Sequence, residues 1–286
     1  MNTQKTFLIT GANSGLGFFT ALGIAKSGGE VIMVCKNPIA GEQAKKEIIK
    51  RSGNTALHLF ITDLSSQTQI RQLAAGIEKS FNKIDALINN AGCNFVKYTC
   101  TEDGIEMQFA VNHLAYFLLS NLLLKKLKNS PQGRIINVSS RAHARGNINF
   151  EDIGFSKNYS PSKAYNQSKL ANILFTYELA RKLNDTNVTV NCMHPGLMNT
   201  PIGNKNSTLL FSLVWTLFKQ LGSNPENASE TCVYLATSEN IKNISGKYFA
   251  NKKEIKSSVT SYNQENAKKL WQMSEELTGL KTNNEI

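Results

Sequence analysis

Short apolar segments alternate with longer amphipathic segments along most of the chain. The short segments FLIT, VIMVC, ALIN and RIINV are apolar on both faces of an extended chain and show no regular polar alternation. Such runs are typical of parallel strands in a sheet that helices cover on both sides. With three similar segments they predict strands at Thr6–Thr10, Glu30–Cys35, Ala56–Ile61, Ile84–Asn89, Arg134–Val138, Val188–Met193 and Lys247–Ala250.

The amphipathic segments between these strands have apolar residues at the spacing of a helix face. They predict helices over residues 15–27, 38–51, 66–80, 104–128, 162–183, 225–238 and 264–278. Because strands and helices alternate to about residue 250, the order predicts an α/β class, doubly wound Rossmann fold with a mostly parallel central sheet. We expect one domain over residues 1–260, with residues 261–286 as its C-terminal helix and tail.

Composition narrows the classes of protein that remain. With 41% hydrophobic residues, the 286-residue chain is not a disordered one. We expect no signal peptide or membrane anchor, because no apolar run reaches about 18 residues and the first strand begins close to Met1. Reduced thiols in a cytoplasmic compartment, and no metal site, are expected from five scattered cysteines without CxxC spacing: Cys35, Cys93, Cys100, Cys192 and Cys232.

The net charge of +11, from 32 Lys plus Arg and 21 Asp plus Glu, raises the question of an anionic partner. Nucleic-acid binding favours a basic stripe with aromatic residues between the cations, and the sequence has none. We therefore expect no specific nucleic-acid partner, while contact with an anionic membrane surface stays open. The basic pairs lie on different predicted elements: Lys45-Lys46, Lys125-Lys126, Lys252-Lys253 and Lys268-Lys269.

A glycine-rich turn follows the first predicted strand and leads directly into a helix. Glycine lets the backbone turn tightly and approach a pyrophosphate, whose charge the free N–H groups at the helix start stabilise. Glycines also serve ordinary turns, but a strand before and a helix after this one predict a dinucleotide-binding loop. The candidate binding residues are Gly11, Asn13, Ser14, Gly15, Leu16 and Gly17.

The end of the second predicted strand bears on the choice of dinucleotide. An acid at this place accepts from the ribose 2′-OH of NAD, whereas a cation suits the 2′-phosphate of NADP. The stretch from Val31 to Asn37 offers Lys36 and no acid. The hypothesis is therefore that NADP(H) is preferred over NAD(H), with a solvated strand-end lysine as the alternative.

Two Tyr-x-x-x-Lys segments lie close together near residue 160. In Tyr165–Lys169 both side chains share one face of a predicted helix, and a nearby ammonium lowers the pKa of a phenol. This pair is a candidate general acid/base for a carbonyl or an alcohol. In the second segment, Pro161 is suited to the first turn of the helix, so Tyr159 is expected outside it and away from Lys163.

These features, with others in suitable order, resemble the short-chain dehydrogenase/reductase superfamily, and most closely its NADP-dependent retinol dehydrogenases that reduce retinal. The resemblance covers nearly the whole chain. It implies a hydride transfer between nicotinamide and a substrate carbon, coupled to a proton transfer. Its further marks are Asp63-Leu64, Asn89-Asn90-Ala91-Gly92, Val111-Asn112-His113-Leu114, Asn137-Val138-Ser139-Ser140, Ser168–Asn172, His194-Pro195-Gly196 and Ser245–Phe249.

The resemblance also implies catalytic roles. Tyr165 would donate or accept the proton, and Lys169 would lower its pKa and bind the nicotinamide ribose. Ser140, rather than its neighbour Ser139, would hydrogen-bond the substrate oxygen. Asn112 would hold the water that links Lys169 to bulk solvent, with a structural asparagine inside a helix as the alternative.

For the cofactor, the resemblance implies that Asp63 binds the adenine amino group and Asn90 shapes the cleft. Thr200 would contact the nicotinamide carboxamide. Asp63 could instead cap the following turn, and Thr200 could be an exposed loop residue. The remaining expected cofactor contacts are Leu64, Ala91, Gly92, Pro195 and Gly196.

Residues 207–219 form a run rich in large apolar residues, including Phe211, Trp215 and Phe218. The resemblance implies that the surrounding segment 197–224 covers the substrate. The run could line an apolar pocket, lie peripherally on a membrane or pack as a buried helix. We expect a hydrophobic carbonyl or alcohol as substrate, and assembly into homo-oligomers stays open. The alternative function is a catalytically silent dinucleotide-binding sensor or scaffold.

Overall fold

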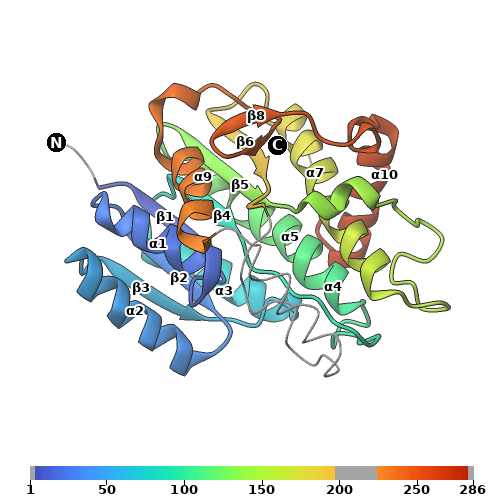
Figure 1. The fold of residues 1–286 in the computed structure, drawn as a ribbon, viewed down its shortest axis with the longest axis horizontal. Coiled ribbons are helices and arrows are strands. Elements are labelled where there is room, and N and C mark those ends of the chain that lie inside the picture. Colours follow the sequence, from blue (N-terminus) through green and yellow to red (C-terminus); the bar gives the residue numbers. More distant parts are fainter. Residues whose placement is uncertain (1–3, 197–223, 283–286) are drawn as a thin grey trace.

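An eight-stranded sheet forms the centre of the computed structural model, which describes residues 4–196 and 224–282 (Figure 1). The strand order is β3-β2-β1-β4-β5-β6-β7-β8, and all neighbours are parallel except β7 and β8. The expected doubly wound, mostly parallel fold is therefore confirmed. The strands are β1 Thr6–Thr10, β2 Glu30–Cys35, β3 Leu57–Ile61, β4 Ala86–Asn89, β5 Gly133–Val138, β6 Val188–Met193, β7 Lys247–Ala250 and β8 Lys253–Ile255.

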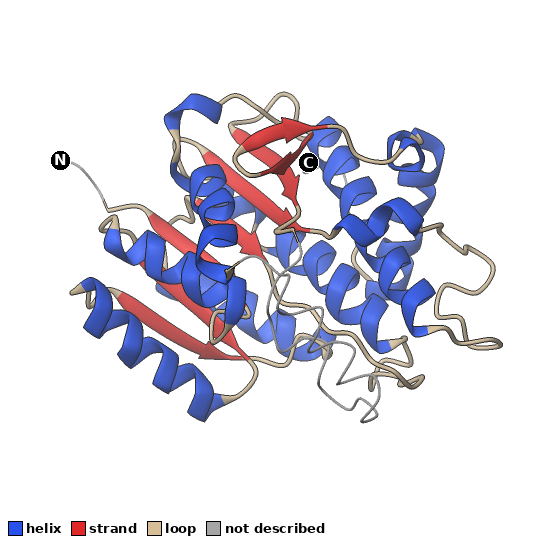
Figure 2. Ribbon diagram, in the orientation of Figure 1, coloured by secondary structure: helices blue, strands red, loops and turns tan. Residues whose placement is uncertain are grey.

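Helices cover both faces of this sheet, and Figure 2 shows α1, α2 and α9 together in front of it. Helices α3, α5 and α7 pack on the opposite face, and α10 lies against α5 and α7. Each helix except those in the 104–128 region begins and ends within about two residues of its predicted range. These helices are α1 Gly15–Lys26, α2 Pro38–Ser52, α3 Gln67–Ser80, α7 Pro161–Lys182, α9 Pro225–Thr237 and α10 Gln264–Thr278.

The strands are apolar at successive positions because both faces of the sheet are buried. In β1, Ile9 packs toward α1 and α2, whereas its neighbour Leu8 packs toward α3 and α5. In β2, Met33 packs toward α1 and α2, and Ile32 packs toward α3 and α5. All four side chains are fully buried, and each contributes about 1.5–3 kcal/mol to stability.

The single helix predicted over residues 104–128 is wrong in detail. The structure begins the helix at α4 Met107–Phe109 and continues through a π-helical turn, Ala110–Leu114, to α5 Ala115–Leu122 and α6 Leu124–Lys128. The helix starts at residue 107 because the Glu106 carboxylate accepts hydrogen bonds from the next free backbone N–H groups, at 2.9 and 2.7 Å. The wider π-helical turn departs from the 3.6-residue period that the sequence pattern assumes.

The sequence pattern does not predict strand β8, because its three residues, Lys253 to Ile255, are exposed and form no apolar run. It pairs with β7 through a turn in which Asn251 and Lys252 have φ angles of 49° and 61°. Two successive left-handed residues are typical of a tight hairpin turn. The antiparallel β8 thus ends the sheet with a short polar edge strand.

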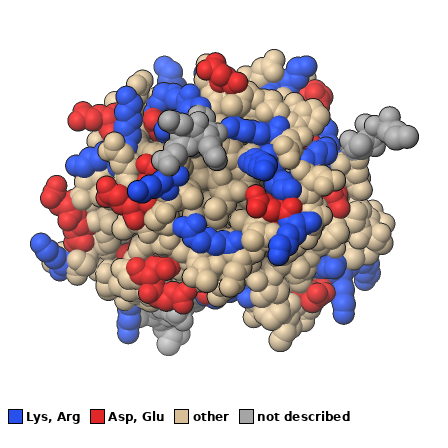
Figure 3. Space-filling view, turned by 180° about the vertical axis from the view of Figure 1, so that it is seen from behind, with Lys and Arg blue, Asp and Glu red and all other residues tan. Residues whose placement is uncertain are grey.

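Basic side chains are spread over the surface in Figure 3, with acidic side chains among them. Among residues 4–196 and 224–282, no helix combines the length and the apolar character needed to cross a membrane. Several cations are paired with acids, as in Lys5–Glu239 and Lys252–Glu230, at 3.3 and 2.7 Å. Charge pairing of this kind is typical of an ordinary solvated surface.

Candidate active site

The candidate residues converge at the carboxyl ends of the central strands. The glycine loop follows β1, Asn90 follows β4, and Ser140 follows β5. Strand order reverses between β1 and β4, and the crevice beyond such a switch point is where doubly wound sheets bind ligands. The topology therefore brings the predicted cofactor loop and the predicted catalytic residues to one edge.

The glycine loop has the backbone geometry that its sequence predicts. Gly11 and Gly15 have positive φ angles of 67° and 54°. A Cβ atom on Gly17 would collide with the Gly11 carbonyl oxygen and with the Asn90 side chain. Ser14 precedes α1 without a side-chain hydrogen bond to its first turn, which leaves N–H groups there available to an anion.

Three hydrogen bonds connect this loop to the residues that follow β4. The Thr10 hydroxyl accepts from the backbone N–H groups of Asn90 and Ala91, at 2.9 and 3.0 Å. The Asn90 side-chain amide donates back to the Thr10 carbonyl, at 2.7 Å. Asn90 therefore holds the start of the loop in place.

Lys36 and Asp63, expected at different parts of the cofactor, form an ion pair with a Nζ–Oδ2 distance of 2.6 Å. The other carboxylate oxygen of Asp63 accepts from the backbone N–H and hydroxyl of Ser65, at 3.0 and 2.7 Å. Although burial raises the pKa of Asp63, the hydrogen bonds from Lys36 and Ser65 outweigh it, so the net direction is downward. The turn-capping alternative for Asp63 is thus present in the structure; the next side chain, Leu64, is buried.

Tyr165 and Lys169 lie one turn apart on α7, and both face the end of β5. The Lys169 ammonium is 5.8 Å from the centre of the Tyr165 ring. It donates to the Val138 carbonyl at 3.2 Å, and the Asn172 amide donates to the same oxygen at 3.3 Å. The Ser140 side chain lies close enough to the Tyr165 hydroxyl to lower its pKa in part.

The acid–base balance of this pair differs from the expectation. Desolvation by the surrounding protein raises the pKa of Tyr165, although the Ser140 side chain lowers it in part. Burial likewise lowers the pKa of Lys169 from 10.5 to about 8. A low dielectric disfavours the charged forms of both side chains, the phenolate of Tyr165 and the ammonium of Lys169.

The two adjacent serines occupy different environments. Ser139 is buried, and its hydroxyl donates to the Lys169 carbonyl at 2.7 Å. Ser140 is partly exposed; its hydroxyl accepts from the Ala142 N–H at 3.2 Å and contacts Tyr165. Ser139 therefore fixes the position of α7, while Ser140 reaches the open side of the site.

Asn112 lies within the π-helical turn, and its side chain is bonded to its surroundings at both ends. Its oxygen accepts from the Cys93 N–H at 2.7 Å, while its amide donates to the Cys93 carbonyl and to Ser168. A Cβ atom on the exposed Gly92 would lie 3.2 Å from the Asn112 oxygen and 3.6 Å from the Lys169 ammonium. Asn112, Gly92 and Lys169 are thus close neighbours, and the expected water contact of Asn112 stays a prediction.

Tyr159 lies outside α7, as Pro161 predicts, since the helix begins at that proline. The Tyr159 hydroxyl donates to the Phe95 carbonyl at 3.1 Å and accepts from the Gln108 amide at 2.7 Å. The Lys163 side chain is exposed. The second Tyr-x-x-x-Lys segment therefore forms no pair.

His143 is a further neighbour of the site, which the sequence motifs do not single out. Its Nδ1 lies 2.7 Å from the Ser140 carbonyl, and its Nε2 accepts from the Ser258 N–H at 3.1 Å. In the sequence, only its place three residues after Ser140 points to the site. The contact with Ser258 joins residues 115 positions apart, so the sequence does not reveal it. His143 connects the turn after β5, which contains Ser140, to the segment that follows β8.

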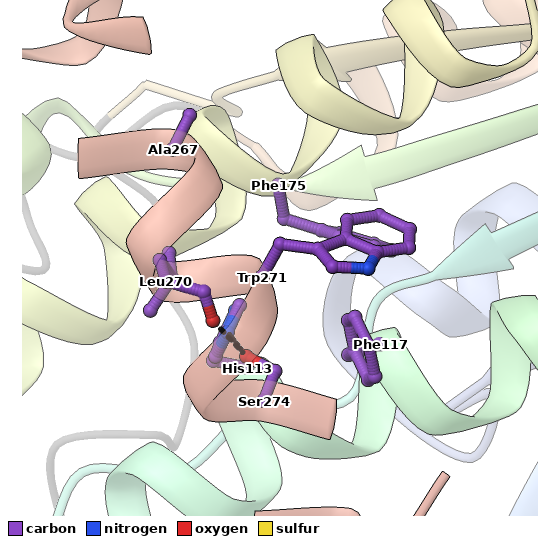
Figure 4. Close-up of a pocket in the computed structure, with 7 residues that line it drawn as sticks. All are labelled: His113, Phe117, Phe175, Ala267, Leu270, Trp271 and Ser274. Atoms are coloured by element: carbon purple, nitrogen blue, oxygen red, sulfur yellow. Dashed lines mark hydrogen bonds between the residues drawn. The ribbon is translucent and has the colours of Figure 1, made fainter. Parts of the chain in front are cut away.

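His113, next to Asn112, lies in a different cluster, where α10 packs on α5 and α7 (Figure 4). Its Nε2 contacts the Ser274 hydroxyl at 3.0 Å, and burial lowers its pKa to about 3. No water-sized ligand fits among the lining residues, so the cluster serves packing. These residues are His113, Phe117, Phe175, Ala267, Leu270, Trp271 and Ser274.

Beyond β6, Gly196 has a φ angle of 79°, and its N–H donates to His194 at 3.0 Å. Gly196 and Pro195 thus lie at the same edge of the sheet as the glycine loop. Thr200, the run 207–219 and nearly all of segment 197–224 lie outside the described residues. In residues 4–196 and 224–282, no three His, Cys, Asp or Glu side chains are arranged to hold a metal ion.

Known proteins share both sequence and fold with this chain. A model of the short chain dehydrogenase family matches residues 5–209. Retinol dehydrogenase 13 of Homo sapiens is 43% identical over 285 residues, which cover 96% of this chain and 85% of the relative.

Two solved structures extend the likeness to the fold. An uncharacterised protein from Mycobacterium paratuberculosis has a TM-score of 0.76 and 33% identity, with 96% of this chain and 94% of that one covered. A short chain dehydrogenase from Shigella flexneri, complexed with NADP, has a TM-score of 0.68 over 87% of this chain and 97% of its own. At 22% identity, the latter likeness concerns the fold alone.

Proposed function

The chain belongs to the short-chain dehydrogenase family of oxidoreductases, and on that premise we propose that it transfers a hydride between NADP(H) and a hydrophobic aldehyde, ketone or alcohol. The observation that carries the proposal is the contact of Ser140 with Tyr165, one helical turn from Lys169. These groups lie at the same sheet edge as the glycine loop. Proton transfer and dinucleotide binding are thereby available side by side.

The residues of this edge suit a dinucleotide. Gly11 and Gly17 let the loop pack closely against Asn90 and Ala91, and the start of α1 offers N–H groups to a pyrophosphate. Lys36 and Asp63 would hold the adenosine end, and Asn90 keeps the loop in position. When bound, the nicotinamide supplies or accepts the hydride.

In the direction of reduction, Tyr165 donates its phenolic proton to the carbonyl oxygen as the hydride reaches the carbonyl carbon. Its raised pKa keeps the phenol protonated before this step. Ser140 donates a hydrogen bond to the same substrate oxygen, and the Lys169 ammonium stabilises the phenolate that remains. The reverse sequence oxidises an alcohol.

A hydrophobic substrate is proposed because relatives of 43% identity are named retinol dehydrogenases. The test is a panel of carbonyl compounds with NADPH and with NADH: retinal, medium-chain aldehydes and small polar carbonyls. We expect turnover of the lipophilic carbonyls with NADPH and a lower KM for NADPH than for NADH.

Activity confined to sugars, or a lower KM for NADH, would contradict this proposal. Dinucleotide binding with no turnover of any carbonyl or alcohol would instead support the silent sensor. Calorimetric titration with NADPH alongside the panel separates these results from a protein that binds no dinucleotide.

A further inference from the structure

The ion pair of Lys36 and Asp63 follows from the register of two parallel strands. Cys35 in β2 is the register partner of Ile61 in β3, and the N–H of Thr62 donates to the Cys35 carbonyl at 2.9 Å. The chain after each strand therefore runs side by side, which brings Lys36 to Asp63. The strand register, rather than a chance meeting of two side chains, therefore places Lys36 beside Asp63.

The two partners differ in freedom. Two hydrogen bonds from Ser65 hold one oxygen of Asp63, and 27% of the Asp63 side chain is exposed. The Lys36 side chain is 71% exposed, and its ammonium is bonded to the other oxygen at 2.6 Å. Asp63 is thus a fixed anion, and Lys36 is a cation with room to turn.

A 2′-phosphate near Lys36 would meet a cation that a carboxylate already neutralises. We infer that Asp63 competes with the 2′-phosphate for Lys36, and so sets how strongly this chain prefers NADPH over NADH. Asp63 is then a specificity-determining residue, in addition to any contact with adenine. This inference rests on the proposed dinucleotide binding at the glycine loop.

NADPH and NADH carry the same adenine, so a lost adenine contact changes the affinity for both equally. Only the release of Lys36, or the removal of a repulsive charge, changes the ratio of the two affinities. The measured quantity is therefore the ratio of the Kd for NADH to the Kd for NADPH, by calorimetric titration, which requires no turnover.

We expect Asp63→Asn to raise this ratio about twofold to fivefold, the range typical of a partly exposed ion pair. Lys36→Met should lower it about tenfold, since a hydrogen bond between charged groups is lost. In the Lys36→Met background, Asp63→Asn should leave the ratio within about 1.5-fold, because no lysine remains to be released. Glu42→Gln is the matched control: it removes one exposed negative charge from α2 and should not change the ratio.

An unchanged ratio in Asp63→Asn overturns the inference. An equal rise with and without Lys36 also overturns it, because Asp63 would then act by simple repulsion of the phosphate. If wild-type protein binds neither NADPH nor NADH, the proposed function fails first. Circular dichroism of each variant confirms that it is folded.

Discussion

Two Tyr-x-x-x-Lys segments six residues apart differ in what surrounds them. Tyr165 and Lys169 lie on α7 and face the edge of the sheet, where Ser140 contacts Tyr165. Tyr159 precedes the helix and is bonded to the loop residue Phe95 and to Gln108. The same spacing thus gives a candidate acid–base pair in one place and a structural contact in the other.

The electrostatics of the two tyrosines differ as well. Burial raises the pKa of both, and it is the largest influence on each. The carboxylate of Glu106 raises the pKa of Tyr159 further, whereas the hydroxyl of Ser140 lowers that of Tyr165. A neighbouring anion makes Tyr159 a poor proton donor, so the sequence motif alone does not define the chemistry.

The largest expected effect separates the two tyrosines by turnover. Tyr165→Phe should reduce kcat about 10²–10⁴-fold while NADPH still binds, because general acid–base catalysis is lost. Tyr159→Phe, the matched control, should keep kcat within about twofold. Steady-state kinetics of both variants with one aldehyde provide the measurement, and comparable losses in the two would contradict the assignment.

The lysines of the two segments, Lys169 and Lys163, should also differ in their effect on kcat, but by a smaller factor than the tyrosines. Lys169→Met should lower kcat about tenfold to hundredfold, since an adjacent opposite charge shifts a pKa by about one to two units. Lys163→Met removes an exposed lysine of the same helix and should have no such effect. If the Lys163 variant loses as much kcat as the Lys169 variant, the pairing of Lys169 with Tyr165 is wrong.

The buried lysine should also affect stability in a pH-dependent manner. The pKa of Lys169 is about 8 in the folded chain, below its ordinary value of 10.5. Between these values the unfolded chain binds a proton that the folded chain does not, so the free energy of unfolding rises with pH. Lys169→Met should therefore increase this free energy at pH 7 by about 1–3 kcal/mol.

The gain from Lys169→Met should shrink as the pH rises from 8 to 10.5. Urea unfolding at pH 7 and pH 10 measures it, with Lys163→Met as the control for loss of an exposed charge. A gain of the same size at both pH values would show that packing, rather than desolvation, is responsible.

The smallest expected effect concerns the structural role of Tyr159. Tyr159→Phe removes the acceptor of the Gln108 amide and the donor to Phe95, which should lower the free energy of unfolding by about 1 kcal/mol. Thermal unfolding of Tyr159→Phe and wild type provides the measurement. An unchanged Tm would indicate that water replaces these bonds.

The fold could be predicted from the sequence because local pattern and long-range packing agree in most elements. For the strand Val188–Met193, the predicted first and last residues agree with the structure, since its apolar run is that of a buried parallel strand. The π-helical turn at Ala110–Leu114 was not, because its hydrogen bonding depends on packing around Asn112 rather than on residue period.

The sequence indicates candidate residues for the site but not which of them pair with one another. Resemblance to a family indicated Ser140 and Tyr165, and the structure brings them together. The bond between Lys36 and Asp63 depends on strand register, which a single sequence does not specify. The contact of His143 with Ser258 likewise joins residues whose distance along the chain hides their proximity.

The Val138 carbonyl oxygen accepts hydrogen bonds from both Lys169 and Asn172, so it does not depend on Lys169 alone. A buried oxygen that loses its last hydrogen-bond donor costs about 1–3 kcal/mol. This cost would ordinarily hold a buried lysine to the oxygen that it bonds. Here the Asn172 amide also donates to this oxygen, so the oxygen would keep a donor if the ammonium turned away. Asn172 would therefore let Lys169 turn toward a new acceptor without leaving the Val138 carbonyl oxygen unsatisfied.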